Sequence, residues 1–159
     1  MSDLISKKMN KQLKINTVFA FMASDGNIAP EEVRVMRNLC GEDVTDDLLN
    51  KMLADLQAAC DAYFSNFLRS VTEAALSKAD AIEIMRVAVD TVLADNCIEY
   101  GEVRLLRRLR ERLPQLTDDE IMDNDPRVDE YWFQPDINAS RPHNIDYTHI
   151  TLPKVILNA

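Results

Sequence analysis

Apolar residues recur every three or four positions over most of the chain, a spacing that places them on one face of an α-helix. They predict helices at about residues 4–23, 30–40, 46–60, 63–76, 80–94 and 100–113, and a short helix after Thr117. The third and fourth of these are either two helices or one continuous helix. The pattern therefore predicts an all-α fold, a compact helical bundle of six or seven helices.

Residues with known preferences for helix ends stand at the predicted boundaries. Pro30 suits the first position of a helix, and Gly41 suits the position after a helix end. Thr45 and Ser77 are expected N-caps, and Thr117 begins the Thr-Asp-Asp-Glu sequence of a capping box. The end signals thus agree with the helices that the periodicity predicts.

The helical pattern stops after Asp125-Pro126, and four of the six prolines lie from that point onward, at positions 126, 135, 142 and 153. We therefore expect residues 1–116 to form a helical domain. Residues 117–159 are expected to form an acidic extension that packs on the domain or binds a partner. Within it, residues 145–157 are rich in β-forming residues and are predicted to be extended, with a short strand at most.

The chain contains an internal repeat with a spacing of 70 residues. When residues 25–37 are placed over residues 95–107, six of the thirteen positions are identical. The identical pairs are Asp25/Asp95, Ile28/Ile98, Glu32/Glu102, Val33/Val103, Arg34/Arg104 and Arg37/Arg107. Each copy lies between two predicted helices, so two related acidic helix–loop–helix units frame the domain.

The acidic residues of the repeat have two interpretations. As capping residues, the Asp accepts hydrogen bonds from loop amides and the Glu reaches back to the start of the next helix. As metal ligands, they match the second half of a calcium-binding loop. The first and third positions of such a loop hold Phe21 and Ala23 in one unit and Thr91 and Leu93 in the other, none of them a carboxylate. The capping interpretation is therefore favoured.

The doubled pattern resembles the TerB-like tellurite-resistance family over about residues 5–113. The resemblance is carried by Ala23-Ser24-Asp25-Gly26-Asn27-Ile28-Ala29-Pro30-Glu31-Glu32 and by its repeat at residues 94–102. It implies a compact helical fold and a role as a partner-binding module in chemical-stress or phage-defence systems. It also implies an acidic patch that binds a divalent cation, such as Ca²⁺, Mg²⁺ or Zn²⁺, and the corresponding residues are Asp25, Glu32, Asp95 and Glu102.

Charge and cysteine content narrow the classes of partner and compartment. The formal net charge is −9, and residues 114–159 carry nine acidic and three basic residues. Because nucleic-acid binding needs a basic footprint, nucleic acid is not an expected partner.

Cys40, Cys60 and Cys97 stand among apolar neighbours without a Cys-x-x-Cys pair, which favours buried, reduced thiols. The sequence has no run that suits a membrane span or a secretory signal, so we expect a cytoplasmic protein.

Two groups of residues are candidate partner-binding sites. The first is a set of arginines on one predicted helix: Arg104, Arg107, Arg108, Arg110 and Arg112. They suit an acidic protein or, as a peripheral contact, an anionic membrane surface. The alternatives are a solvated helix face and pairing with the acidic extension of the same chain. The second is the aromatic cluster Tyr131, Trp132 and Phe133. This cluster either anchors the extension on the domain or forms a binding hot spot.

No motif in the sequence indicates catalysis. The two histidines, His143 and His149, accompany neither a nucleophile motif nor a zinc-binding spacing, and a phosphate-binding Gly-rich loop is absent. The sequence therefore predicts a non-enzymatic protein-interaction or sensor module of a stress-response or defence system. The alternative is an acidic inhibitor or immunity-type protein that blocks a basic partner enzyme.

Overall fold

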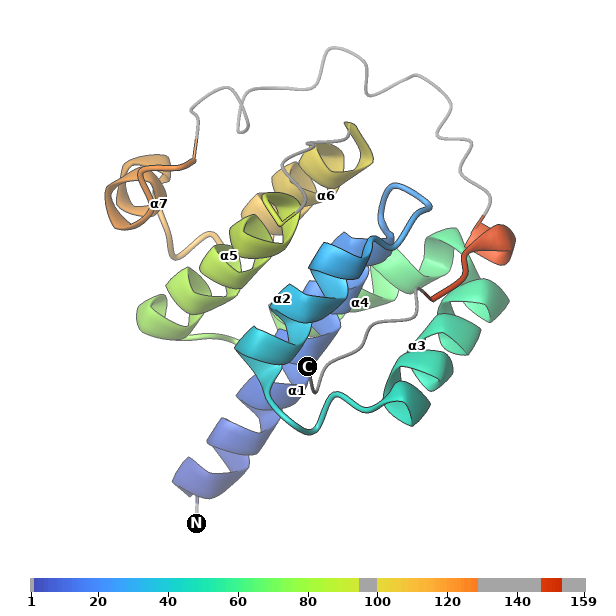
Figure 1. The fold of residues 1–159 in the computed structure, drawn as a ribbon. Coiled ribbons are helices and arrows are strands. Elements are labelled where there is room, and N and C mark those ends of the chain that lie inside the picture. Colours follow the sequence, from blue (N-terminus) through green and yellow to red (C-terminus); the bar gives the residue numbers. More distant parts are fainter. Residues whose placement is uncertain (1, 95–99, 129–146, 153–159) are drawn as a thin grey trace.

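The computed structural model describes residues 2–94, 100–128 and 147–152, with side chains from Lys11 onward except that of Tyr100. These residues form seven α-helices, one 3-10 turn and no strand (Figure 1). The helices are α1 (Ser2–Ala23), α2 (Pro30–Cys40), α3 (Asp46–Ala59), α4 (Asp61–Glu73), α5 (Lys78–Val92), α6 (Tyr100–Glu111) and α7 (Asp118–Asn124), and the 3-10 turn is η2 (Tyr147–His149). The predicted all-α bundle is confirmed.

Helices α1 and α5 form the centre of the bundle. Helix α1 packs against α2, α4, α5 and α6, and α5 also packs against α2, α6 and α7 (Figure 1). Every residue of α1 from Thr17 to Ala23 is buried, as are residues 87–89 of α5. A helix that is buried on all sides has to lie inside the protein. The other helices are therefore arranged around these two segments.

The predicted capping residues make the expected hydrogen bonds. The hydroxyls of Thr45, Ser77 and Thr117 each accept a bond from the amide three residues later, at 3.1–3.2 Å. Helix α2 begins at Pro30, and Gly41 follows its end with φ of +83°. The sixth helix ends at residue 111, two residues earlier than predicted. The helix ends that the predicted capping residues mark therefore lie within two residues of their predicted positions.

Helices α3 and α4 are separate, and a single residue, Cys60, joins them. Cys60 has φ of +51° and ψ of −123°, so its backbone leaves the helical region and the chain turns there. Its amide still donates to the Leu56 carbonyl at 2.6 Å, and its own carbonyl accepts the Tyr63 amide at 3.0 Å. The turn therefore needs no intervening loop, and it positions the start of α4 beside α3.

Two parts of the extension pack on the bundle. Val128 belongs to the buried core, and so do Tyr147 and Ile150 on either side of the end of η2. The Gln57 side-chain amide donates to the carbonyls of Thr148 and Ile150, at 3.3 Å and 3.1 Å, and so attaches this segment to α3. The extended conformation predicted for this region is wrong at residues 147–149. A 3-10 turn brings residues three apart onto one side, so Tyr147 and Ile150 are both buried.

Candidate partner-binding site

The predicted metal ligands of the first unit bond to their own loop. The Asn27 amide donates to Asp25 Oδ1 at 3.0 Å, and the Ala29 amide donates to Glu32 Oε1 at 2.8 Å. Glu32 is 2% exposed, whereas Asp25 is partly exposed. Both bonds are those that the capping interpretation predicts: Asp25 accepts a loop amide, and Glu32 reaches back to the amide of Ala29, the N-cap of α2.

Glu102 occupies the equivalent position in the second unit and is 1% exposed. The residue before it, Gly101, lies against the first loop. A Cβ atom added at Gly101 would lie 2.7 Å from the Ser24 carbonyl oxygen and 3.3 Å from the Asp25 Cα atom. The two units therefore touch through their backbones, at a distance that only glycine allows.

The described residues contain no group of three or more His, Cys, Asp or Glu side chains arranged to hold a metal ion. Asp25, Glu32 and Glu102 therefore do not form such a group together, and Asp95 lies outside the described residues. One oxygen of Asp25 and one of Glu32 already accept loop amides. Binding of Ca²⁺, Mg²⁺ or Zn²⁺ by the four acids stays a prediction.

The arginines between positions 104 and 112 have different surroundings. Arg110 donates to Asp118 Oδ1 at 2.6 Å and to two carbonyl oxygens beyond the end of α6, at 2.9 Å and 3.2 Å. Arg112 donates to the Thr72 hydroxyl at 3.2 Å. These two arginines therefore connect the end of α6 to α7 and to α4. The bond from Arg110 to Asp118 is an example of the expected alternative in which these arginines pair with the acidic extension.

Arg104 and Arg108 lie one helical turn apart on the same face of α6 and line a hollow of about 250 Å³, which we call the α6 hollow. Its other lining residues are Ser24, Asp61, Phe64, Ser65, Gly101, Leu105 and Tyr147. Phe64 and Leu105 are 4% and 3% exposed and give the hollow an apolar surface. Arg107, the third predicted binding residue of this helix, is partly buried and is not part of the lining.

The two arginines of the α6 hollow have no close ionic contact within the part of the chain that the structure describes. Neither Arg104 nor Arg108 forms a hydrogen bond or an ion pair there. Burial lowers the pKa of Arg108, and the charges of Arg104 and Arg112 lower this pKa further. An arginine keeps its proton at neutral pH, so the lowered pKa indicates that its charge is poorly stabilised. Glu111 and, to a smaller extent, Asp61, which also lines the hollow, raise this pKa.

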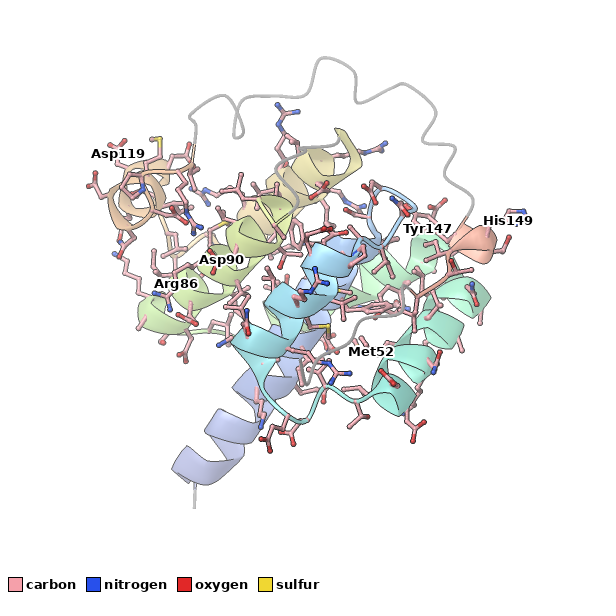
Figure 2. The ribbon with its side chains drawn as sticks, in the orientation of Figure 1. Met52, Arg86, Asp90, Asp119, Tyr147 and His149 are labelled. Atoms are coloured by element: carbon pink, nitrogen blue, oxygen red, sulfur yellow. The ribbon has the colours of Figure 1, made fainter. Side chains whose placement is uncertain are left out.

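Only Arg104 and Arg108 of the lining were predicted from the sequence as binding residues, and Tyr147 is one of the residues that were not. Figure 2 shows Tyr147 on the side of η2 that faces the bundle and His149 on the outer side. The ring of Tyr147 packs against Phe64 with the ring centroids 5.1 Å apart, and the Tyr147 hydroxyl donates to the Ser24 carbonyl at 3.4 Å. Burial, followed by the negative charge of Asp61, raises the pKa of Tyr147 to about 12. The spacing of Tyr147 and Ile150 is the sequence signal that could have found it.

The other candidate residues are the cysteines that the structure describes and a group that lies outside the described residues. Cys40 is buried and free, and burial raises the pKa of its thiol to about 11, while Cys60 is free and partly buried. The predicted aromatic site (Tyr131, Trp132 and Phe133), Cys97 and His143 all lie outside the described residues. Partner binding by the aromatic cluster stays a prediction.

None of the described helices combines the length and the apolar character that a membrane span requires. Comparison with known protein families, with curated proteins and with solved structures finds no match.

Proposed function

We propose that the chain is a non-enzymatic protein-interaction module, and that the α6 hollow is where its partner docks. The observation that carries this proposal is the presence of two arginines, Arg104 and Arg108, that are partly buried in one hollow and form no hydrogen bond or ion pair with the described residues. Partly burying two like charges costs stability, and a protein tolerates such a cost where a ligand supplies the missing counter-charge.

The chemistry of the hollow suits recognition. A protonated Tyr147 hydroxyl is a hydrogen-bond donor, and its raised pKa makes it a poor general base at neutral pH. Arginine likewise donates hydrogen bonds, and its guanidinium group stays protonated at neutral pH. Basic, hydroxyl and apolar groups around one hollow are typical of a surface that holds an acidic group of another protein.

The pathway part of the proposal comes from the resemblance to the TerB-like family, which implies a recruiting or sensing role in a stress or defence assembly. In that role a divalent cation bound at Asp25, Glu32, Asp95 and Glu102 would modulate the module. Calorimetric titration with Ca²⁺, Mg²⁺ and Zn²⁺ tests this part. Micromolar binding that is lost in Asp25→Asn/Asp95→Asn supports a sensor, and absence of binding removes the metal from the proposal.

Affinity capture from the native host tests the docking site. We expect the wild-type chain to retain a specific partner that Arg104→Glu/Arg108→Glu no longer retains, because charge reversal at a binding surface abolishes complementarity. Arg86→Glu is the matched control, since Arg86 is an exposed arginine of α5, far from Tyr147 in Figure 2. Equal retention of the same proteins by all three chains would contradict the proposal. A captured basic enzyme that loses activity on binding would instead support the inhibitor alternative.

A further inference from the structure

We infer that the α6 hollow binds the C-terminal carboxylate of the partner protein, with the apolar side chain of the partner's last residue against Phe64 and Leu105. The inference rests on the proposed function and specifies the group that the hollow recognises. It follows from the size of the hollow, the balance of its charges and the arrangement of its polar and apolar lining.

The size of the hollow limits its ligand to about one residue. Its volume of about 250 Å³ lies below the roughly 300–1,000 Å³ that is typical of small-molecule sites. A whole helix or an extended peptide segment therefore does not fit inside it. The last residue of a chain fits, because the rest of the partner then lies outside the hollow.

The charges favour a single negative charge on the ligand. Arg104 and Arg108 bring two positive charges and Asp61 one negative charge, so the lining has a formal charge of +1 at neutral pH. A carboxylate neutralises this charge, and the planar guanidinium group binds it through two parallel hydrogen bonds. A phosphate group, with a charge of roughly −1.5 to −2 at pH 7, would exceed the positive charge and be repelled by Asp61.

The order of residues on α6 places basic and apolar lining side by side. Leu105 follows Arg104 in the sequence, and Phe64 stands next to Ser65 on α4. A C-terminal residue presents a carboxylate and a side chain on the same Cα atom, so both reach the hollow together. The carboxylate of an internal Asp or Glu lies at the tip of its side chain, which leaves no second group to cover Phe64 and Leu105.

The hydroxyl groups of the lining complete the site. Ser65 is exposed, and its hydroxyl is available to donate a hydrogen bond to a carboxylate oxygen. The Tyr147 hydroxyl lies in the same lining and donates to the Ser24 carbonyl at 3.4 Å. The hollow thus offers donors of two kinds, guanidinium and hydroxyl, to one carboxylate.

A nuclear magnetic resonance titration of the full chain, labelled with ¹⁵N, tests this inference with N-acetyl-leucine as the probe. We expect saturable shifts at the amides of Ser65, Arg104 and Leu105. N-acetyl-leucinamide, which has the same side chain but no carboxylate, is expected to cause none of them. In Arg104→Gln/Arg108→Gln the affinity for N-acetyl-leucine should fall at least about tenfold, as expected when charge-assisted hydrogen bonds are lost. Arg86→Gln should bind like the wild type.

Three results would overturn the inference: no saturable shifts at these amides, equal binding of the leucinamide, or tighter binding of phenyl phosphate or of N-acetyl-glutamate α-amide. These results are distinguishable from a failure of the proposed function. If Arg104 and Arg108 are needed for partner capture but N-acetyl-leucine does not bind, the interaction module stands and the C-terminal carboxylate is wrong. If N-acetyl-leucine binds but no partner depends on the two arginines, the ligand is a free carboxylic acid and both proposals fail.

Discussion

At the scale of single residues, Arg108 and Arg110 show why residue type alone does not define a site. They stand two positions apart on α6, and their side chains have opposite surroundings. Arg110 makes three hydrogen bonds that fix the connection to α7, whereas Arg108 shares the α6 hollow with Arg104 and has no ion pair among the described residues. The same charge is therefore stabilised at one position and poorly stabilised at the other.

This contrast predicts opposite effects of the same substitution. Arg110→Gln should lower the free energy of unfolding by about 1–2 kcal/mol, since it removes bonds to two carbonyl oxygens and to Asp118. Arg108→Gln should leave that free energy unchanged or raise it, because it removes a repelled charge. Urea denaturation of both variants at neutral pH measures the two effects. A larger loss for Arg108→Gln than for Arg110→Gln would contradict our description of the hollow.

At the scale of elements, the two helix–loop–helix units are a sequence repeat whose described parts share one structural feature. Glu32 and Glu102 occupy the same repeat position, and both are almost fully buried at the start of a helix. The loop of the first unit contacts the second unit at Gly101, whose repeat counterpart is Glu31. The contact between the units therefore depends on a position where the two copies differ.

Gly101→Ala tests this contact. In most helices a change from glycine to alanine stabilises the protein by up to about 1 kcal/mol. Here the new Cβ atom would lie 2.7 Å from the Ser24 carbonyl oxygen, so we expect a loss of about 1–3 kcal/mol in the free energy of unfolding. Urea denaturation provides the measurement, and a gain in stability would show that the two units do not pack this closely.

The segment after α7 is attached to α5 by an ion-pair network. Arg127 donates to both oxygens of Asp125, at 2.8 Å and 2.7 Å, and its Nη2 atom lies 2.5 Å from Asp90 Oδ1. Figure 2 shows Asp90 on α5, on the same helix as Arg86. The bonds from Arg127 are the main cause of the lowered pKa of Asp125.

The lowered pKa of Asp125 predicts a dependence of stability on pH. A carboxyl group with a lower pKa in the folded chain stabilises the fold above its unfolded pKa of about 3.9. This contribution is lost as the pH falls through the folded pKa. In Asp125→Asn the melting temperature should be lower near neutral pH and should fall less steeply on acidification. Thermal unfolding between about pH 7 and about pH 2 measures both slopes, and parallel curves would exclude a role for Asp125.

At the scale of the whole molecule, the sequence predicts local features well and the site only in part. The helices, their caps and the buried acids follow from spacings of three to eight residues, which a single helix or loop determines. The α6 hollow combines α4, α6 and η2, which are far apart in the sequence, so no short pattern describes it. The repeat emphasises Arg104 and Arg107, whereas the hollow uses Arg108, whose counterpart in the first unit is Asn38.

Docking of a partner at the α6 hollow is the central claim, and site-specific photo-crosslinking in the native host tests it most directly. A photoreactive residue is placed at Ser65, an exposed residue of the lining, and at Asp119, an exposed residue of α7. In Figure 2 Asp119 lies far from Tyr147, which also lines the hollow. We predict a crosslinked partner at position 65 that is absent at position 119 and is lost when Arg104→Glu/Arg108→Glu is added. No crosslink at position 65, or one that persists after charge reversal, would contradict the claim.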